Sequence, residues 1–315
     1  MQQGRQAVSR LEKRRLGRTG LEATVLGFGA MDLGGPPVTN VITDDEAGRV
    51  LNAVLDSGIN YIDTSIDYNV SEARIGQAIS HRRKEFFLAT KCGCVPGKPM
   101  GTGHVNTAAN IRAGVEHSLR TMKTDYIDVV QFHESLTRSA WEADGGLDEL
   151  RKMKKEGKLH FIGVSGTLPN LAEQIKSGVF DVFQIPYSAL QREHEDMISK
   201  ASEAGAGIVI RGGVARGAPS DWDRRYYMLT KDEMSSRWDK ARLDELLDGM
   251  SRIEFMVRFV ISNPDLDTTI IGTKDLEHLR ANLEAAMKGP LPEDVVTEAK
   301  RRLDLTGSRP VKTEK

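Results

Sequence analysis

The stretch GINYIDTSIDYNVSEARIG, residues 58–76, decides the fold. Its first glycine ends one helix, a short and mostly apolar strand follows over residues 60–64, and a new helix begins at Ser71. The strand carries Asp63 near its end, and the loop after it carries Tyr68. An ionisable side chain at the carboxyl end of a buried strand is typical of an enzyme built on a barrel of parallel strands.

The same strand-then-helix pattern recurs along the chain. The expected strands are residues 25–29, 60–64, 86–91, 126–133, 160–165, 182–185, 207–211 and 268–271. The helices expected after later strands include residues 146–155, 170–176, 193–204, 243–262 and 275–287. Alternating strands and helices predict a parallel sheet. Eight such units without a break in composition predict an α/β protein of the (β/α)₈ TIM-barrel class. A doubly wound sheet is the second choice.

Two further elements and two tails complete the prediction. Residues 13–24 read as a β-hairpin before the barrel, and residues 290–305 as an extra C-terminal helix. No linker divides the chain, so residues 1–315 are expected to form a single domain. Residues 1–12 and 306–315 are expected to be loose tails.

The composition indicates an ordinary soluble protein. The 44 basic and 45 acidic residues leave a net charge of −1, which argues against nucleic acid or an anionic membrane as the main partner. No apolar run approaches the roughly 18 residues of a membrane helix, and the first dozen residues lack the apolar centre of a signal peptide. The only two cysteines, Cys92 and Cys94, are too close in sequence to staple a fold, so we expect a cytoplasmic protein.

Four ionisable residues are expected to meet at the barrel mouth. Asp63, Lys91 and His133 each end a predicted strand, and Tyr68 follows one. A phenol titrates near about 10, and a neighbouring ammonium lowers its pKa. A carboxylate would hold the ammonium in place, and a neutral imidazole would donate a hydrogen bond to an oxygen that gains charge. The set therefore suits the proton half of a carbonyl reduction, with Tyr68 as the donor.

These residues and their contexts, DTSIDY, FLATK and DVVQFH, together with Ser71 and Glu72, resemble the aldo-keto reductases. The resemblance covers about residues 13–283 and implies an NADP(H)-dependent oxidoreductase that interconverts an aldehyde or ketone, sugars included, and an alcohol. It also implies the roles of Asp63, Tyr68, Lys91 and His133 as the catalytic residues. NADPH is the preferred cofactor, with NADH as the alternative, and either direction of reaction is open.

The resemblance also implies where the nicotinamide cofactor binds, since the chain has no G-x-G-x-x-G for a Rossmann site. Ser165 and Gln184 would hold the carboxamide. Gly166 stands where the family usually has Asn, and Arg211 where many members have a stacking Tyr. The remaining cofactor residues expected from the resemblance are Met31, Asp63, Gly272, Thr273, Lys274, His278 and Asn282.

The phosphate end of that site is expected at a helix start. Thr273 and Asp275 stand where a helix N-terminus would receive a phosphate, with Lys274 as the counter-charge. His278 stands where NADP-preferring members carry an Arg. Substrate is expected to meet the loops that follow the strands, including residues 215–237, which carry Trp222.

The sequence bears on two other functions. The fold is shared with the nicotinamide-binding β subunits of potassium channels, so a regulatory subunit with little turnover is the alternative. A metal-dependent lyase is disfavoured because clustered His and carboxylate ligands are missing from the sequence. For the same reason no metal site is expected at Cys92 and Cys94. The number of subunits is left open.

Overall fold

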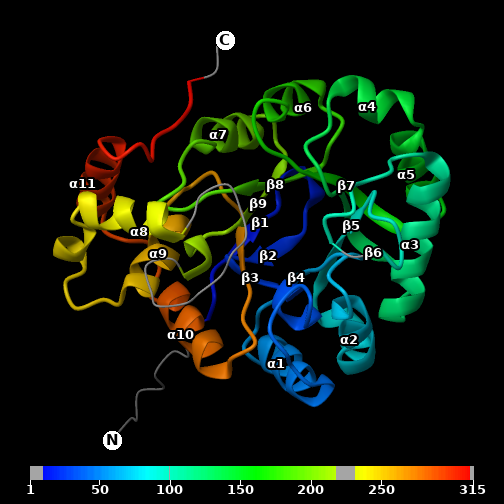
Figure 1. Ribbon diagram of the computed structural model, residues 1–315, viewed down its shortest axis with the longest axis horizontal. Coiled ribbons are helices and arrows are strands. Elements are labelled where there is room, and N and C mark those ends of the chain that lie inside the picture. Colours follow the sequence, from blue (N-terminus) through cyan, green and yellow to red (C-terminus); the bar gives the residue numbers. More distant parts are fainter. Residues whose placement is uncertain (1–9, 99, 218–230, 313–315) are drawn as a thin grey trace, which may run out of the picture.

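The computed structural model describes residues 10–98, 100–217 and 231–312. Eight parallel strands close into a barrel in the order β10-β3-β4-β5-β6-β7-β8-β9, with helices around it (Figure 1). The strands are β3 (Leu26–Gly29), β4 (Tyr61–Asp63), β5 (Phe87–Cys92), β6 (Ile127–Phe132), β7 (Leu159–Ser165), β8 (Val182–Pro186), β9 (Gly207–Arg211) and β10 (Thr268–Ile271). The TIM-barrel prediction is confirmed, and the doubly wound alternative is wrong because β10 pairs with β3 and closes the ring.

The strands are apolar because helices cover them outside and side chains fill the barrel inside. All six residues of β6 are buried, for example. The helices are α1 (Asp44–Asp56), α2 (Ser71–Ala78), α3 (Ala108–Met122), α4 (Arg138–Ala143), α5 (Gly146–Lys155), α6 (Leu171–Ser177), α7 (Glu195–Glu203), α8 (Lys231–Lys240), α9 (Arg252–Ile261), α10 (Leu276–Met287) and α11 (Glu293–Asp304). Among the described residues, no helix combines the length and apolarity needed to cross a membrane.

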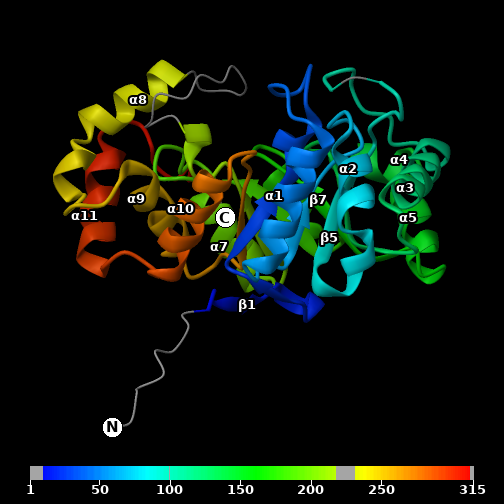
Figure 2. The ribbon, with the colours of Figure 1, turned by 90° about the horizontal axis from the view of Figure 1, so that it is seen from below.

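A hairpin closes the amino-terminal end of the barrel. Its strands β1 (Lys13–Arg15) and β2 (Glu22–Thr24) pair antiparallel, as predicted, and a 3₁₀ turn, η1 (Gly17–Thr19), lies between them. Leu16 is fully buried in a cluster with inward-facing barrel residues such as Val129 and Val209. Figure 2 shows β1 at one end of the barrel and α8 at the other. The hairpin thus seals the floor and leaves the carboxyl ends of the strands as the mouth.

One guanidinium ties this floor to the last barrel strand. Arg14 Nη1 donates to the carbonyl oxygens of Asn263 and Leu266 at 3.2 and 3.0 Å, and Arg14 Nη2 donates to that of Ile261 at 3.0 Å. These carbonyls lie at the end of α9 and in the turn that leads into β10.

One expected element differs from the structure, and two elements of the structure were not expected. The single helix expected over residues 243–262 is a 3₁₀ turn, η5 (Leu243–Leu246), followed by α9, because Asp248 and Gly249 adopt positive φ angles of 42° and 80°. A left-handed residue ends a helix. Helix α4 and the 3₁₀ turn η3 (Ser80–Glu85) were not expected.

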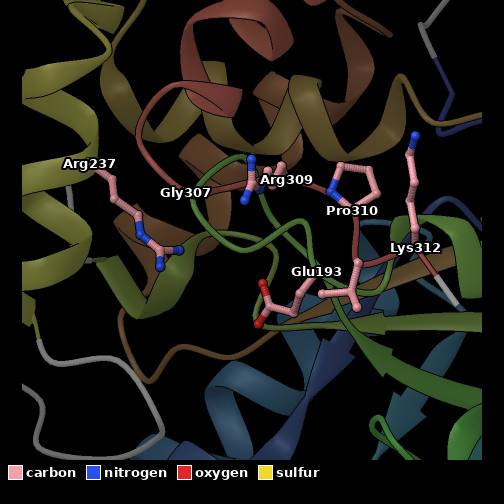
Figure 3. A pocket seen from close by; sticks show the side chains of 7 residues that line it. Glu193, Arg237, Gly307, Arg309, Pro310 and Lys312 are labelled. Atoms are coloured by element: carbon pink, nitrogen blue, oxygen red, sulfur yellow. The ribbon is translucent and has the colours of Figure 1, made fainter.

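The C-terminal segment packs against the barrel instead of forming a loose tail from residue 306. Ser308 is fully buried, and its hydroxyl donates to the carbonyl of Ala189 at 2.7 Å. The buried Arg192 donates to the carbonyl of Ser308 at 3.1 Å. Gly307 and residues 309–312 form one wall of a pocket of about 630 Å³, with Glu193 and Arg237 as further lining residues (Figure 3). Residues 1–9 and 313–315 of the expected tails lie outside the described residues.

Candidate active site

Asp63 is the centre of a buried hydrogen-bond network at the mouth. It ends β4, and Lys91 lies near the end of the neighbouring β5. Lys91 Nζ lies 2.7 and 2.6 Å from the two carboxylate oxygens of Asp63, and it also donates to the carbonyl of Thr64 at 3.0 Å. Gln131 and Gln184 each donate an amide N–H to Asp63 Oδ2 at 3.0 Å. A buried ion pair with this many additional donors is held in one geometry.

Tyr68 and His133 meet beside this network, as the sequence predicts. The hydroxyl of Tyr68 lies 3.4 Å from Nε2 of His133, and the rings meet edge to face. Tyr68 is 8% exposed, so its phenol is almost enclosed. The loop after β4 places Tyr68 there, while His133 follows β6 directly.

The other nitrogen of His133 faces a second group of polar atoms. Nδ1 lies 3.2 Å from the sulfur of Cys94, 3.3 Å from the hydroxyl of Ser65 and 3.4 Å from Asp67 Oδ1. Ser65 donates its own proton to Asp67 Oδ1 at 2.5 Å. Since Asp67 only accepts hydrogen bonds, these surroundings assign a proton to Nδ1 and leave the Nε2 lone pair toward Tyr68.

The protonation of this pair follows from its burial. Burial lowers the pKa of His133 below its usual range, although the hydrogen bond to Asp67 works in the opposite direction. Burial alone would raise the pKa of Asp67, but hydrogen bonds from His133 and Ser65 bring it to about 2. The site therefore holds a neutral imidazole and an ionised carboxylate at neutral pH, which keeps the imidazole suited to exchange a proton with Tyr68.

The expected nicotinamide residues lie on neighbouring strands. Ser165 ends β7 and pairs in register with Gln184 on β8. Gly166 follows, and a Cβ atom built on it would come within 2.5 Å of Gln174 Oε1. Gln174 donates to the carbonyl of Leu136 at 2.8 Å, while its buried Oε1 has no hydrogen-bond partner among the described residues. An unsatisfied buried amide oxygen beside a missing side chain fits the NH₂ of a cofactor carboxamide.

The remaining expected cofactor residues lie at or after the ends of β9, β10 and β3. Arg211 ends β9, and Met31 lies in η2 (Ala30–Gly34), which follows β3. Gly272 and Thr273 follow β10, and His278 and the buried Asn282 lie on α10. A Cβ atom on Gly272 would fall 2.6 Å from the carbonyl oxygen of Gly29, so only glycine fits this close approach of two backbones.

The start of α10 differs from the expected phosphate site. The carboxylate of Asp275 accepts from the backbone N–H of Glu277 at 2.7 Å and so caps the helix itself. Lys274 Nζ donates to the carbonyl of Val41, in the loop that precedes α1, at 3.0 Å. A negative cap at a helix start competes with a bound phosphate. The ammonium of Lys274 lies beside the start of α10.

Sequence reasoning missed several residues of the site. Gln131, on β6, lies two residues before His133. Side chains two residues apart on a strand point to the same face, so this spacing could have predicted Gln131 as a residue of the site. Ser65, Asp67 and Gln174 carry no such signal, because loops and a helix bring them in. Of the expected loop over residues 215–237, residues 218–230, which include Trp222, lie outside the described residues, and residues 231–237 belong to helix α8. Burial raises the pKa of both cysteine thiols, so neither is a ready thiolate.

A closed (β/α)₈ barrel with a buried Asp–Lys pair and a Tyr–His pair at its mouth is typical of enzymes that use acid–base chemistry. The comparison with known families names the class. Residues 25–303 match the Aldo/keto reductase family, and the chain belongs to it.

Relatives and a solved structure agree with this membership. The chain is similar to aldo-keto reductase AKR11C1 from Bacillus halodurans in its holo form, at 28% identity and a TM-score of 0.79, over 93% of this chain and 96% of that one. It is 25% identical to the L-galactose dehydrogenase of Arabidopsis thaliana, over 88% of this chain and 89% of the relative. It is 26% identical to the NADH-specific methylglyoxal reductase of Escherichia coli, over 87% of this chain and 93% of the relative.

Proposed function

We propose that this protein is an NADP(H)-dependent oxidoreductase that interconverts a small aldehyde or ketone and the corresponding alcohol, with Tyr68 as the proton donor and acceptor. The contact of Tyr68 with His133 beside the buried Lys91–Asp63 pair is the observation that carries this proposal. Family membership supplies the general class, an oxidoreductase with a nicotinamide cofactor.

The protein residues divide the proton chemistry among them. During reduction, Tyr68 gives its hydroxyl proton to the substrate oxygen, while the bound nicotinamide supplies the hydride. The positive charge of Lys91, held by Asp63, favours the phenolate that Tyr68 becomes. His133 Nε2 lies within reach of the phenol oxygen, so His133 exchanges the proton with Tyr68 and orients it.

Three polar side chains would hold the carboxamide of the cofactor. Ser165 and Gln184 lie in register on neighbouring strands. In this proposal Gln174 supplies the amide oxygen that residue 166 lacks, because its unpartnered Oε1 occupies the space next to Gly166. Gly166 therefore does not cost the site a contact.

The preference for NADPH rests on the cation of Lys274 near the expected adenosine end, although His278, in the first turn of α10, replaces the Arg of NADP-preferring members. The E. coli relative carries the name of an NADH-specific enzyme. Titrating both cofactors against the wild-type protein tests the preference directly, and tighter binding of NADH would overturn it. The Arabidopsis relative is named for a sugar substrate, so the carbonyl panel should include sugars and methylglyoxal.

The test of the catalytic assignment is Tyr68→Phe, assayed as NADPH oxidation against that panel. We expect kcat to fall about 10²–10⁴-fold, the usual contribution of a general acid, while the cofactor Kd stays unchanged. Tyr126→Phe is the matched control, because Tyr126 stacks on His160 at the opposite end of β6 and should keep wild-type kcat.

Two outcomes would contradict the proposal. Wild-type kcat in Tyr68→Phe would remove Tyr68 from the proton transfer. Tight cofactor binding by the wild-type protein without turnover of any carbonyl or alcohol would instead favour the regulatory alternative.

A further inference from the structure

Four potential metal ligands, His133 among them, meet in the barrel mouth, although no metal site was expected from the sequence. Asp67 comes from the loop after β4, Cys94 and His104 from the loop after β5, and His133 from the end of β6. One ligand atom from each lies within 4.8 Å of every other. Within the described residues, no other group of three or more such side chains reaches this density.

The distances within the group are close to those of a tetrahedral zinc site. Zinc binds imidazole and carboxylate at about 2.0–2.2 Å and thiolate at about 2.3 Å, so neighbouring ligands lie about 3.3–3.8 Å apart. His133 Nδ1 lies 3.2 Å from Cys94 Sγ and 3.4 Å from Asp67 Oδ1. The rings of His104 and His133 lie 5.3 Å apart, centroid to centroid. One ring nitrogen of His104 lies within 4.8 Å of the ligand atoms of the other three residues.

The group also has polar neighbours of the kind that orient metal ligands. Ser65 donates to Asp67 Oδ1 at 2.5 Å. Glu134 Oε2 lies 3.6 Å from His104 Nδ1, and Asn106 fixes this carboxylate with a hydrogen bond of 2.6 Å. Asp67 and Cys94 are buried, while the side chains of His104 and His133 are 21% and 14% exposed, so the group opens to solvent on the histidine side.

We propose that Asp67, Cys94, His104 and His133 form a zinc-binding site in the barrel mouth. A borderline-soft divalent ion suits a mixed set of nitrogen, sulfur and oxygen ligands. Zn²⁺ binds the Cys94 thiolate, and the thiol proton leaves to solvent. Zinc on His133 Nδ1 also moves the remaining ring proton to Nε2, so His133 then donates a hydrogen bond toward Tyr68 instead of accepting one.

The test is a titration of tag-free, chelator-treated protein with Co²⁺, which reports its ligands through its spectrum. We expect one equivalent to bind with the bands of a tetrahedral ion and a thiolate-to-cobalt charge-transfer band, and Zn²⁺ to displace it. Cys94→Ser should lose the charge-transfer band, whereas Cys92→Ala should keep it, because Cys92 packs in the apolar core.

A second pair of variants guards against a folding defect in Cys94→Ser. His104→Ala, in a partly exposed loop, should weaken binding by more than the roughly 10–100-fold that loss of an outer partner costs. His81→Ala, at an exposed position outside the group, should leave it unchanged. Absence of a stoichiometric cobalt complex, or wild-type affinity in folded Cys94→Ser or His104→Ala, would overturn the proposal. Binding needs no cofactor or substrate, so its failure would leave the proposed reductase function standing.

Discussion

Replacing Glu72 by glutamine should make the protein less sensitive to alkaline pH. Glu72 opens α2 and is only 2% exposed, and Thr90 donates its hydroxyl to Glu72 Oε1 at 2.6 Å. Burial raises the pKa of this carboxyl from 4.5 to about 7, against the opposing effect of the Thr90 hydrogen bond. Glutamine keeps the shape and an acceptor for Thr90 but carries no charge at any pH.

The direction and size of the effect follow from linkage. Because the folded pKa lies above the unfolded one, the contribution of Glu72 to stability is fully present below pH 4.5 and is lost as the pH rises through about 7. At about 1.4 kcal/mol per pKa unit, the wild-type protein should lose about 2–3 kcal/mol between about pH 5 and about pH 9 through this group alone.

Urea unfolding of wild type and Glu72→Gln at both pH values measures this quantity. As the pH rises from about 5 to about 9, the free energy of unfolding of the variant should increase relative to that of the wild type by about 2–3 kcal/mol. Glu173→Gln, at an exposed position on α6, makes the same chemical change without burial and should give a constant difference. A constant difference for Glu72→Gln as well would refute the reasoning, since ionisation of Glu72 would then carry no penalty.

Three further changes test packing, the buried ion pair and the cofactor contact. Gly76→Ala places a Cβ atom onto the backbone of Thr121 and 2.8 Å from Met122 Cα, so we expect a loss of about 1–3 kcal/mol in urea unfolding. Gly48→Ala, whose Cβ atom would meet Ala78 at an ordinary 3.7 Å, should instead stabilise α1 by up to about 1 kcal/mol; equal effects would contradict the packing argument. Asp63→Asn leaves the Lys91 ammonium buried without its carboxylate. It should lower the free energy of unfolding in urea by about 3–5 kcal/mol and abolish turnover. An unchanged unfolding midpoint would show that the ion pair is not needed for stability. Gln174→Met removes the proposed carboxamide contact and should raise the Kd for NADPH about 5–10-fold in a fluorescence titration, whereas an unchanged Kd in a folded variant would remove Gln174 from the cofactor site.

Strand ends were predictable from the sequence because a barrel collects them at one mouth. The order of strands and the family resemblance were enough to predict that Asp63, Tyr68, Lys91 and His133 lie at the mouth. In the structure Tyr68 contacts His133, and Lys91 contacts Asp63. The break at Asp248 and Gly249 also had a signal, since Asp-Gly favours a turn, but the apolar pattern on both sides concealed it.

Side chains that reach the site from loops and helices were not predictable in the same way. Gln174 lies on α6, and only the packing of that helix reveals that its amide fills the space beside Gly166. Cys94, His104 and His133 come from two connections whose paths the sequence does not specify. The polar C-terminal residues looked unanchored, but Ser308 uses backbone and hydroxyl bonds that leave no hydrophobic pattern.

The Arg14 contacts join the N-terminal hairpin to the turn that leads into β10, the last strand of the barrel. During synthesis, the hairpin leaves the ribosome long before its three carbonyl acceptors exist. The hairpin is therefore fully attached to the barrel only at the stage when β10 can also pair with β3 and close the ring. A change that destabilises residues 261–268 would weaken both the attachment of the hairpin and the pairing of β10 with β3. The barrel mouth lies at the other end of these strands.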